Sequence, residues 1–150
     1  MLKQLTALFL LGAAFTSPAT AAATAGAASR ANAVMYKNPG CECCDGHAAA
    51  LRSAGLNVKV VPTEDLAAFK ARAGVPHALQ GCHMTMVDGY AVEGHVPVAA
   101  VQRMLKEKPA IRGIALPGMP SGSPGMSGPK TAPFKVLSFG AGGTKLYAVE

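Results

Sequence analysis

The stretch Asn38-Pro39-Gly40-Cys41-Glu42-Cys43-Cys44-Asp45-Gly46 decides how the rest of the chain is interpreted. Three of the four cysteines of the chain lie here within four consecutive positions. A thioredoxin-like redox site needs only the outer pair of a Cys-x-x-Cys motif, which is Cys41 and Cys44. The additional thiol of Cys43 and the distant Cys82 therefore favour metal binding over simple dithiol exchange.

The segments around this stretch alternate between strand and helix patterns. A short apolar run precedes the cysteines, and a helix pattern from about residue 44 to 53 follows them and ends at Gly55. A second strand then leads to a helix that is capped by residues 63–65 and ends at Gly74. Asp-Gly between two alternating apolar runs predicts a β-hairpin. The expected strands are 33–37, 57–62, 84–87 and 90–94, and a third helix is expected at 96–106.

This order, β-α-β-α-β-β-α, predicts an α/β fold of the thioredoxin-like kind, with a mixed sheet flanked by helices. A C-terminal extension follows it. Residues 111–116 predict a further short strand, and residues 134–139 and 144–149 predict a β-hairpin. The segment between them, 117–133, is rich in Gly, Pro and Ser and carries Pro-Gly-Met twice, so we expect a long loop.

The N-terminus has the pattern of a secretory signal peptide over residues 1–21. Lys3 supplies a basic start, residues 5–15 are apolar, and small residues follow up to Ala21. The apolar run is short for a membrane span of about 20 residues, and a retained N-terminal anchor is the alternative. We expect an exported chain, not bound to a membrane after cleavage, with a lead over 22–32 and one metal-binding domain over 33–150.

The charge pattern excludes little except nucleic-acid binding. The formal net charge is +6 and falls to +5 once Lys3 leaves with the signal peptide. The basic residues are scattered and there is no Trp, so neither a basic stripe nor a set of stacking aromatics is present. We expect no nucleic-acid partner.

Structural disulfides are an alternative use of the cysteines, because an exported chain meets an oxidising compartment. A bridge between the neighbours Cys43 and Cys44 is unfavourable, because bridged Cα atoms are at least about 4.4 Å apart and neighbouring ones are about 3.8 Å apart. The pairs Cys41–Cys44 and Cys43–Cys82 remain open.

Metal binding fits the position of the thiols better. Cysteines at the start of a helix meet free N–H groups and the positive end of the dipole, which stabilise thiolates. In a thioredoxin-like fold, the loop with Cys82 lies against the same helix end. Thiolates select Cu(I), Zn(II) or iron–sulfur clusters. We expect Cys43 and Cys44 to point apart, which disfavours one tetrahedral ion and favours several Cu(I) ions. Export through the general secretory route disfavours an iron–sulfur cluster.

Several motifs together resemble the CopG-type family, which is often described only as a metal-binding domain of unknown function. They are Cys-x-Cys-Cys after Asn38-Pro39-Gly40, Gly81-Cys82-His83, 87–90 (Val-Asp-Gly-Tyr), 93–97 (Glu-Gly-His-Val-Pro) and the repeated Pro-Gly-Met. The resemblance runs from about Val34 to the C-terminus. It implies a periplasmic copper-resistance protein that holds a multinuclear Cu(I) cluster on Cys41, Cys43, Cys44 and Cys82. Its expected partners are copper ions and a periplasmic copper chaperone or efflux component. Storage, delivery and Cu(I)/Cu(II) redox conversion are all open.

Further ligands are candidates by position. His83 follows Cys82, and His47 lies one helical turn after Cys43 and Cys44. Met86 completes Cys82-x-x-x-Met86, although a strand methionine such as Met84 or Met86 usually packs in a core. Thioethers are soft donors, so Met119 and Met126 are candidates too, with a loop anchor as the alternative. His95, before a helix, is expected to be a cap or structural residue, and His77 has no pattern.

Three functions compete on this evidence. The first is copper binding in resistance or homeostasis. The second is a thiol–disulfide oxidoreductase that uses Cys41 and Cys44, and the third is a disulfide-stabilised interaction module. A third thiol inside the Cys-x-x-Cys interval counts against the second, because it invites shuffling or metal capture. Whether the copper turns over is left open, since no nicotinamide or flavin motif is present.

Overall fold

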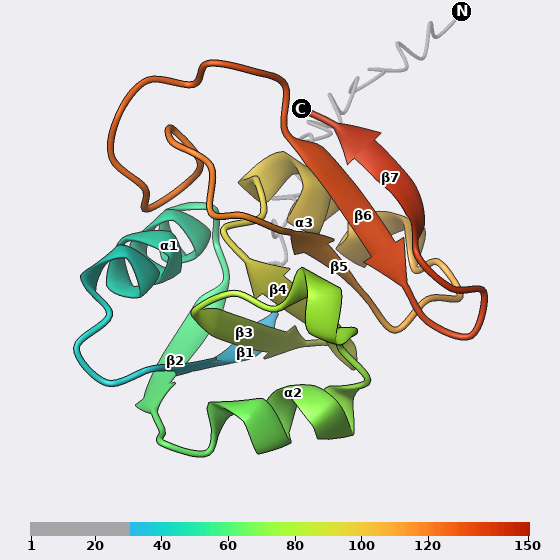
Figure 1. Ribbon diagram of the computed structural model, residues 1–150, viewed down its shortest axis with the longest axis horizontal. Coiled ribbons are helices and arrows are strands. Elements are labelled where there is room, and N and C mark those ends of the chain that lie inside the picture. The colour runs from blue at the N-terminus through green and yellow to red at the C-terminus, as the bar shows by residue number, and fades with distance from the viewer. Residues whose placement is uncertain (1–30) are drawn as a thin grey trace, which may run out of the picture.

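The structure is a computed structural model that describes residues 31–150 (Figure 1). The signal peptide predicted over 1–21, and the lead up to residue 30, lie outside the described residues. The elements, in chain order, are β1 (Asn32–Lys37), α1 (Glu42–Ser53), β2 (Asn57–Pro62), α2 (Leu66–Ala73), the 3₁₀ helix η1 (His77–Leu79), β3 (His83–Val87), β4 (Tyr90–Gly94), α3 (Val98–Glu107), β5 (Gly113–Leu116), β6 (Lys135–Phe139) and β7 (Lys145–Val149).

The strands form one mixed sheet in the order β2-β1-β3-β4-β5-β6-β7. β1 pairs with β2 in parallel through the crossover helix α1, and β3 lies antiparallel to β1. β3 and β4 form the predicted hairpin, and its two turn residues, Asp88 and Gly89, both have positive φ, as a tight two-residue turn requires. These features confirm the predicted α/β fold class, and the antiparallel pairing of β6 with β7 confirms the predicted terminal hairpin.

Helices cover both faces of the sheet. α1 and α3 pack on one face, where Leu51 and Val101 meet Met35 and Val92 of the strands. α2 covers the other face, where Phe69 packs with a separate buried cluster that includes Met84. Because side chains alternate along a strand, neighbouring residues of β3 serve different layers. This alternation decides which side of the sheet each candidate ligand occupies.

The C-terminal extension adds β5, a long loop and the β6–β7 hairpin to the edge of the sheet. The loop from 117 to 134 passes beside α1 (Figure 1). Gly125 approaches the helix very closely. A Cβ on Gly125 would lie 2.4 Å from the Cys43 carbonyl oxygen and 2.4 Å from the His47 backbone nitrogen. The loop predicted from its Gly and Pro content is therefore packed against the helix that carries the cysteines.

Element boundaries differ from the sequence predictions by a few residues. α1 begins at Glu42 and not near Cys44, because Cys41 adopts the extended backbone of an N-cap. α3 begins at Val98 because Pro97 is itself the extended N-cap residue. Within residues 31–150, no helix combines the length and the apolar character that a bilayer crossing would need.

Candidate metal centre

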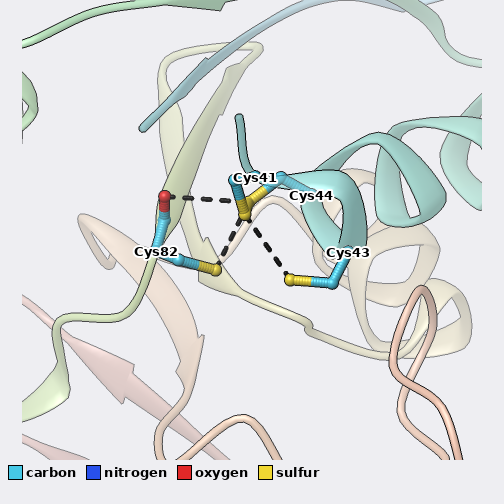
Figure 2. Close-up of side chains that lie close together, drawn as sticks. All are labelled: Cys41, Cys43, Cys44 and Cys82. Atoms are coloured by element: carbon cyan, nitrogen blue, oxygen red, sulfur yellow. Dashed lines mark hydrogen bonds between the residues drawn. A yellow bond between two sulfur atoms is a disulfide. The ribbon is translucent and has the colours of Figure 1, made fainter. Parts of the chain in front are cut away.

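The four cysteines come together at the N-terminus of α1. Cys41 is the N-cap, Cys43 and Cys44 lie in the first turn, and Cys82 directly precedes β3. The Sγ atoms of Cys41 and Cys43 are 3.5 Å apart, and those of Cys44 and Cys82 are 3.3 Å apart (Figure 2). All four Sγ atoms lie within 4.8 Å of one another. Cys43 and Cys44 therefore do not direct their sulfurs as far apart as the sequence argument assumed.

Two of these sulfurs are joined to each other. Cys41 and Cys44 form a disulfide, whereas Cys43 and Cys82 are free thiols (Figure 2). One bridge of the disulfide alternative is thus present, and the Cys43–Cys82 bridge is not. Cys44 is fully buried, while the other three cysteines are partly exposed. The described state is the oxidised one, in which only two thiols are free to bind metal.

A buried lysine holds the Cys41 loop. Lys37, at the end of β1, donates through Nζ to the Cys41 carbonyl at 2.9 Å and pairs with the Asp45 carboxylate at 2.6 Å. The Asn38 N–H donates to the Cys82 carbonyl at 3.3 Å, which ties the two cysteine segments together. The relative position of the thiols therefore rests on backbone groups as well as on the sheet.

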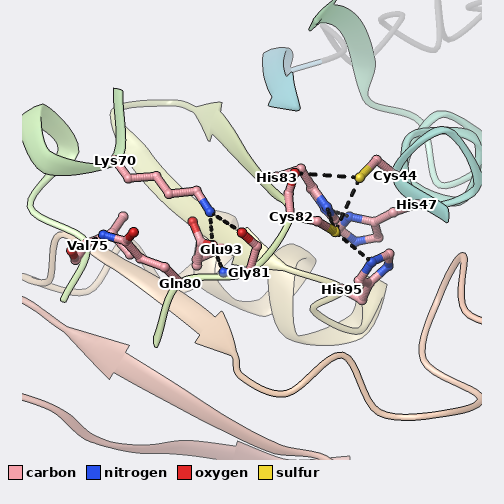
Figure 3. Close-up of polar contacts among 10 residues, drawn as sticks. All are labelled: Cys44, His47, Lys70, Val75, Gln80, Gly81, Cys82, His83, Glu93 and His95. Atoms are coloured by element: carbon pink, nitrogen blue, oxygen red, sulfur yellow. Dashed lines mark hydrogen bonds and ion pairs between the residues drawn. The ribbon is translucent and has the colours of Figure 1, made fainter. Parts of the chain in front are cut away.

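A second buried lysine holds the Cys82 segment from the opposite face of the sheet. Lys70 of α2 lies 2.7 Å from the Glu93 carboxylate, and the two side chains are 2% and 0% exposed. Lys70 also donates to the Gly81 carbonyl at 2.6 Å, and Glu93 accepts from the Gly81 N–H (Figure 3). The pair therefore binds both polar backbone groups of the residue before Cys82. Sequence reasoning missed it, although the position of Lys70 four residues after Leu66 places it on the buried face of α2.

Three buried histidines lie next to the sulfurs. They are His47 of α1, His83 at the start of β3 and His95 just after β4, and none has exposed surface. His47 Nδ1 and His83 Nε2 are 2.7 Å apart. The Cys82 Sγ is 3.5 Å from both His83 Nδ1 and His95 Nε2, so the thiol joins the imidazole group to the sulfur group (Figure 3).

Burial shifts the pKa values of these groups in the direction that favours their neutral forms. Desolvation lowers the pKa of His47 to about 4 and that of His83 to about 2, and it also lowers the pKa of His95. Neighbouring imidazoles lower the first two further. Burial, followed by the nearby Cys43 thiol, raises the pKa of Cys82 to about 11, against a smaller opposing effect of Lys70. At neutral pH the histidines are therefore neutral imidazoles, the form that binds metals.

The long loop closes over this group. The His95 Nδ1 donates to the Pro124 carbonyl at 2.9 Å. The next residue, Gly125, is the one that lies against the backbone of Cys43 and His47, and a Cβ on Gly46 would be 2.9 Å from its Cα. The extension thus orients one histidine and covers the first turns of α1.

The chain is similar to one protein family and to two solved structures. A family described as "Protein of unknown function, DUF411" matches residues 79–126. The solved structure "Copper resistance protein copG- Form 2" superimposes with a TM-score of 0.74 at 32% identity, covering 81% of this chain and 98% of that one. "Copper resistance protein copG- Form 1" gives 0.73 at 34% identity, covering 79% and 96%. No curated protein matches the sequence.

This chain belongs to the CopG-type copper-resistance family. The region matched by the family model holds Cys82, His83 and His95 but not the Cys-x-Cys-Cys stretch. A family named for copper resistance and a cluster of cysteine donors agree on a copper-related function.

The remaining candidate ligands of this CopG-type chain fall in different places. His47 and His83 lie in the centre, and so does His95, which sequence reasoning assigned to a cap or structural role. Met86 does not reach it, because it packs with the cluster under α2 on the other face of the sheet. Met119 is 40% exposed in the loop, and Met126 is half-buried directly after Gly125.

Proposed function

We propose that this chain binds Cu(I) through Cys41, Cys43, Cys44 and Cys82 as a multinuclear thiolate cluster, in the service of copper resistance or homeostasis. The observation that carries the proposal is the convergence of four Sγ atoms, from two separate segments, to within 4.8 Å. Thiolate is the soft donor that Cu(I) prefers. The free N–H groups and dipole of α1 favour negative charge at the same place.

Reduction must precede binding to all four cysteines. Opening the Cys41–Cys44 disulfide takes two electrons and two protons and yields two thiols. Cys41 is partly exposed and Cys44 is fully buried, so an external dithiol attacks the Cys41 sulfur, and Cys44 leaves as a thiolate inside the centre. Metal uptake by the reduced protein then displaces the remaining thiol protons.

The number of copper ions is part of the proposal. Sulfurs that share one tetrahedral ion at about 2.3 Å lie about 3.8 Å apart. The observed separations of 3.3 and 3.5 Å suit such an ion as well as several bridged ions. We favour several, because four thiolates carry four negative charges and several Cu(I) ions offset them more completely than one does.

The cellular setting follows from the sequence expectations. We propose an exported, periplasmic protein of one metal-binding domain over 33–150, with the signal peptide over 1–21 removed. A copper chaperone or an efflux component is the partner that loads or unloads it. Cu(I)/Cu(II) conversion is a further use of the same centre, besides storage and delivery.

Anaerobic Cu(I) titration of the reduced mature protein tests the proposal, read by metal analysis and by competition with a Cu(I) chelator. We expect several Cu(I) ions per chain and the loss of most of this capacity in Cys43→Ser. His77→Gln is the control, because His77 is exposed on η1 and should leave the capacity unchanged. If the parent protein bound one Cu(I) ion or none, and Cys43→Ser bound the same number, the proposed cluster would be wrong.

A thiol–disulfide oxidoreductase is the second candidate, and the Cys41–Cys44 disulfide is the observation that favours it. Cys43→Ser separates the two functions as well. An oxidoreductase keeps its Cys41–Cys44 pair and its exchange rate with a dithiol in this variant, whereas a copper cluster loses a bridging sulfur. Retained exchange together with unchanged copper binding would favour the second candidate.

A further inference from the structure

The buried histidines carry an inference of their own, separate from the four-cysteine site. Three side chains from α1, from the start of β3 and from the turn after β4 place one nitrogen each within 4.8 Å of the others. We infer that His47, His83 and His95, with the Cys82 sulfur as a fourth donor, form a second metal site for a divalent ion. That this ion is Cu(II) as cargo rests on the proposed function, and the site itself does not.

Backbone carbonyls fix the tautomers of two of the rings. His47 Nε2 lies 3.0 Å from the Val96 carbonyl, and His95 Nδ1 lies 2.9 Å from the Pro124 carbonyl. A carbonyl only accepts, so both of these nitrogens carry hydrogen. The lone pairs of His47 Nδ1 and His95 Nε2 therefore face the centre. Metal-binding histidines commonly donate their other N–H in this way, which holds the ring in place.

His83 completes the nitrogen set. Its Nε2 is 2.7 Å from His47 Nδ1, so without metal its N–H donates to that lone pair. Two nitrogens on one tetrahedral ion lie about 3.3 Å apart. The two rings therefore separate by about 0.6 Å on binding, and the proton between them moves to His83 Nδ1, which leaves the imidazole neutral.

Cys82 provides both the fourth donor and the entrance. Its Sγ is 3.5 Å from His95 Nε2, one of the ligand nitrogens, and 3.5 Å from His83 Nδ1, which donates to the sulfur once it carries the proton. It is partly exposed, whereas the three rings have no exposed surface, so an ion reaches the nitrogens past this sulfur. Its Sγ also lies 3.3 Å from the Sγ of the buried Cys44, which makes Cys82 common to both sites.

The donor chemistry selects a different ion from that of the cysteine site. Imidazole suits borderline divalent ions such as Zn(II), Co(II) and Cu(II), and among these Cu(II) binds most tightly to a given nitrogen site. The rings stay neutral because burial lowers their pKa values. An N₃S set that shares Cys82 with the S₄ set thus gives the centre one position for a divalent ion and one for Cu(I).

The test uses the Cys43→Ser variant with the Cys41–Cys44 disulfide intact, so that Cys82 is the single free thiol among the described cysteines. Co(II) is the probe, because it does not oxidise thiols and because tetrahedral Co(II) gives intense visible bands. We expect about one Co(II) per chain, with tetrahedral bands and a thiolate-to-cobalt charge-transfer band that Cys82→Ser removes.

Two matched variants delete a ligand nitrogen and keep the backbone hydrogen bond. His95→Asn retains a donor for the Pro124 carbonyl, and His47→Gln retains one for the Val96 carbonyl. Mutating a residue that only hydrogen-bonds to a metal ligand typically lowers metal affinity about ten- to hundredfold. Loss of a ligand itself should therefore lower the Co(II) affinity of each variant by more than about tenfold. His77→Gln should bind like the parent. Circular dichroism confirms that each variant is folded.

The inference is overturned if the folded Cys43→Ser protein binds no Co(II), or binds it with octahedral bands that His47→Gln and His95→Asn leave unchanged. These results are independent of the Cu(I) titration of the reduced protein. If the reduced protein binds no Cu(I) but Cys43→Ser binds Co(II), the proposed cluster is wrong and the histidine site is supported. If Cu(I) binds and Co(II) does not, only the histidine site is wrong.

Discussion

The sulfur and imidazole halves of the centre lie side by side and are built in different ways. Three of the four sulfurs come from one short stretch. All but the Cys44 sulfur belong to partly exposed residues, and two of them change state when the Cys41–Cys44 disulfide forms. The three imidazoles come from three distant segments and are fully buried, and two of them, His47 and His95, are held by backbone carbonyl groups. The comparison teaches that this fold combines an accessible, redox-dependent half with a preformed, enclosed half.

The largest expected effect concerns the redox state. The reduced protein should bind several Cu(I) ions, and the protein with the Cys41–Cys44 disulfide should lose this capacity, because two of four thiolates are gone. Co(II) binding by the imidazole half should persist in the Cys43→Ser protein with the disulfide intact. Metal analysis after gel filtration measures both. If the oxidised and reduced proteins bound the same number of Cu(I) ions, the sulfur half would not be redox-dependent as described.

The next effect concerns the lysines behind the two halves. Lys70→Met leaves the Glu93 carboxylate buried without its partner, which should cost about 3–5 kcal/mol of unfolding free energy. Lys37→Met should cost about 1 kcal/mol or less through its ion pair, because Asp45 is 57% exposed and water replaces the lysine.

Urea unfolding of the oxidised proteins measures both losses. The double variant Lys70→Met with Glu93→Gln should recover part of the stability, since no buried charge remains. If Lys70→Met and Lys37→Met lost the same unfolding free energy, burial of the Lys70–Glu93 pair would not determine how much that pair contributes to stability.

A smaller effect concerns the loop over the imidazole half. Gly125→Ala places a Cβ 2.4 Å from the backbone of Cys43 and His47, so the loop must move. Gly118→Ala is the control, because Gly118 also has a positive φ and its Cβ would meet nothing within 4 Å. Thermal unfolding should show Gly125→Ala to be less stable than the control by about 1–3 kcal/mol. Matching stabilities would mean that the loop does not pack on α1.

The smallest effect is expected at Met86. This residue packs under α2, on the far side of the sheet from both halves. Met86→Leu should leave the Cu(I) capacity and the Co(II) spectrum unchanged and alter stability by less than about 1.5 kcal/mol, because the volume is conserved. A drop in copper capacity in this variant would return Met86 to the candidate ligands.

Most of the fold was predictable because local signals agree. Gly74 ends α2, and Asp88-Gly89 forms the β3–β4 turn, where sequence patterns place them. The cysteine group was also predictable, because its members cluster in the sequence. His95 was missed, yet the two-residue turn fixes the register, with Met84 opposite Glu93. Continuing that register by two residues places Cys82 opposite His95.

Other parts of the centre had no local signal. Lysines are rarely buried, so nothing in the pattern marked Lys37 as a core residue. The approach of Gly125 to Gly46 depends on how a long loop returns to the first helix. Such contacts between distant segments depend on tertiary packing, and neither periodicity nor turn chemistry encodes them.

Copper K-edge X-ray absorption of the reduced, Cu(I)-saturated protein tests the central claim most directly. A thiolate cluster predicts a first shell dominated by sulfur at about 2.3 Å, by analogy with other metal–thiolate bonds, together with copper–copper scattering that disappears in Cys43→Ser. A first shell of nitrogen or oxygen without copper–copper scattering would contradict the cluster.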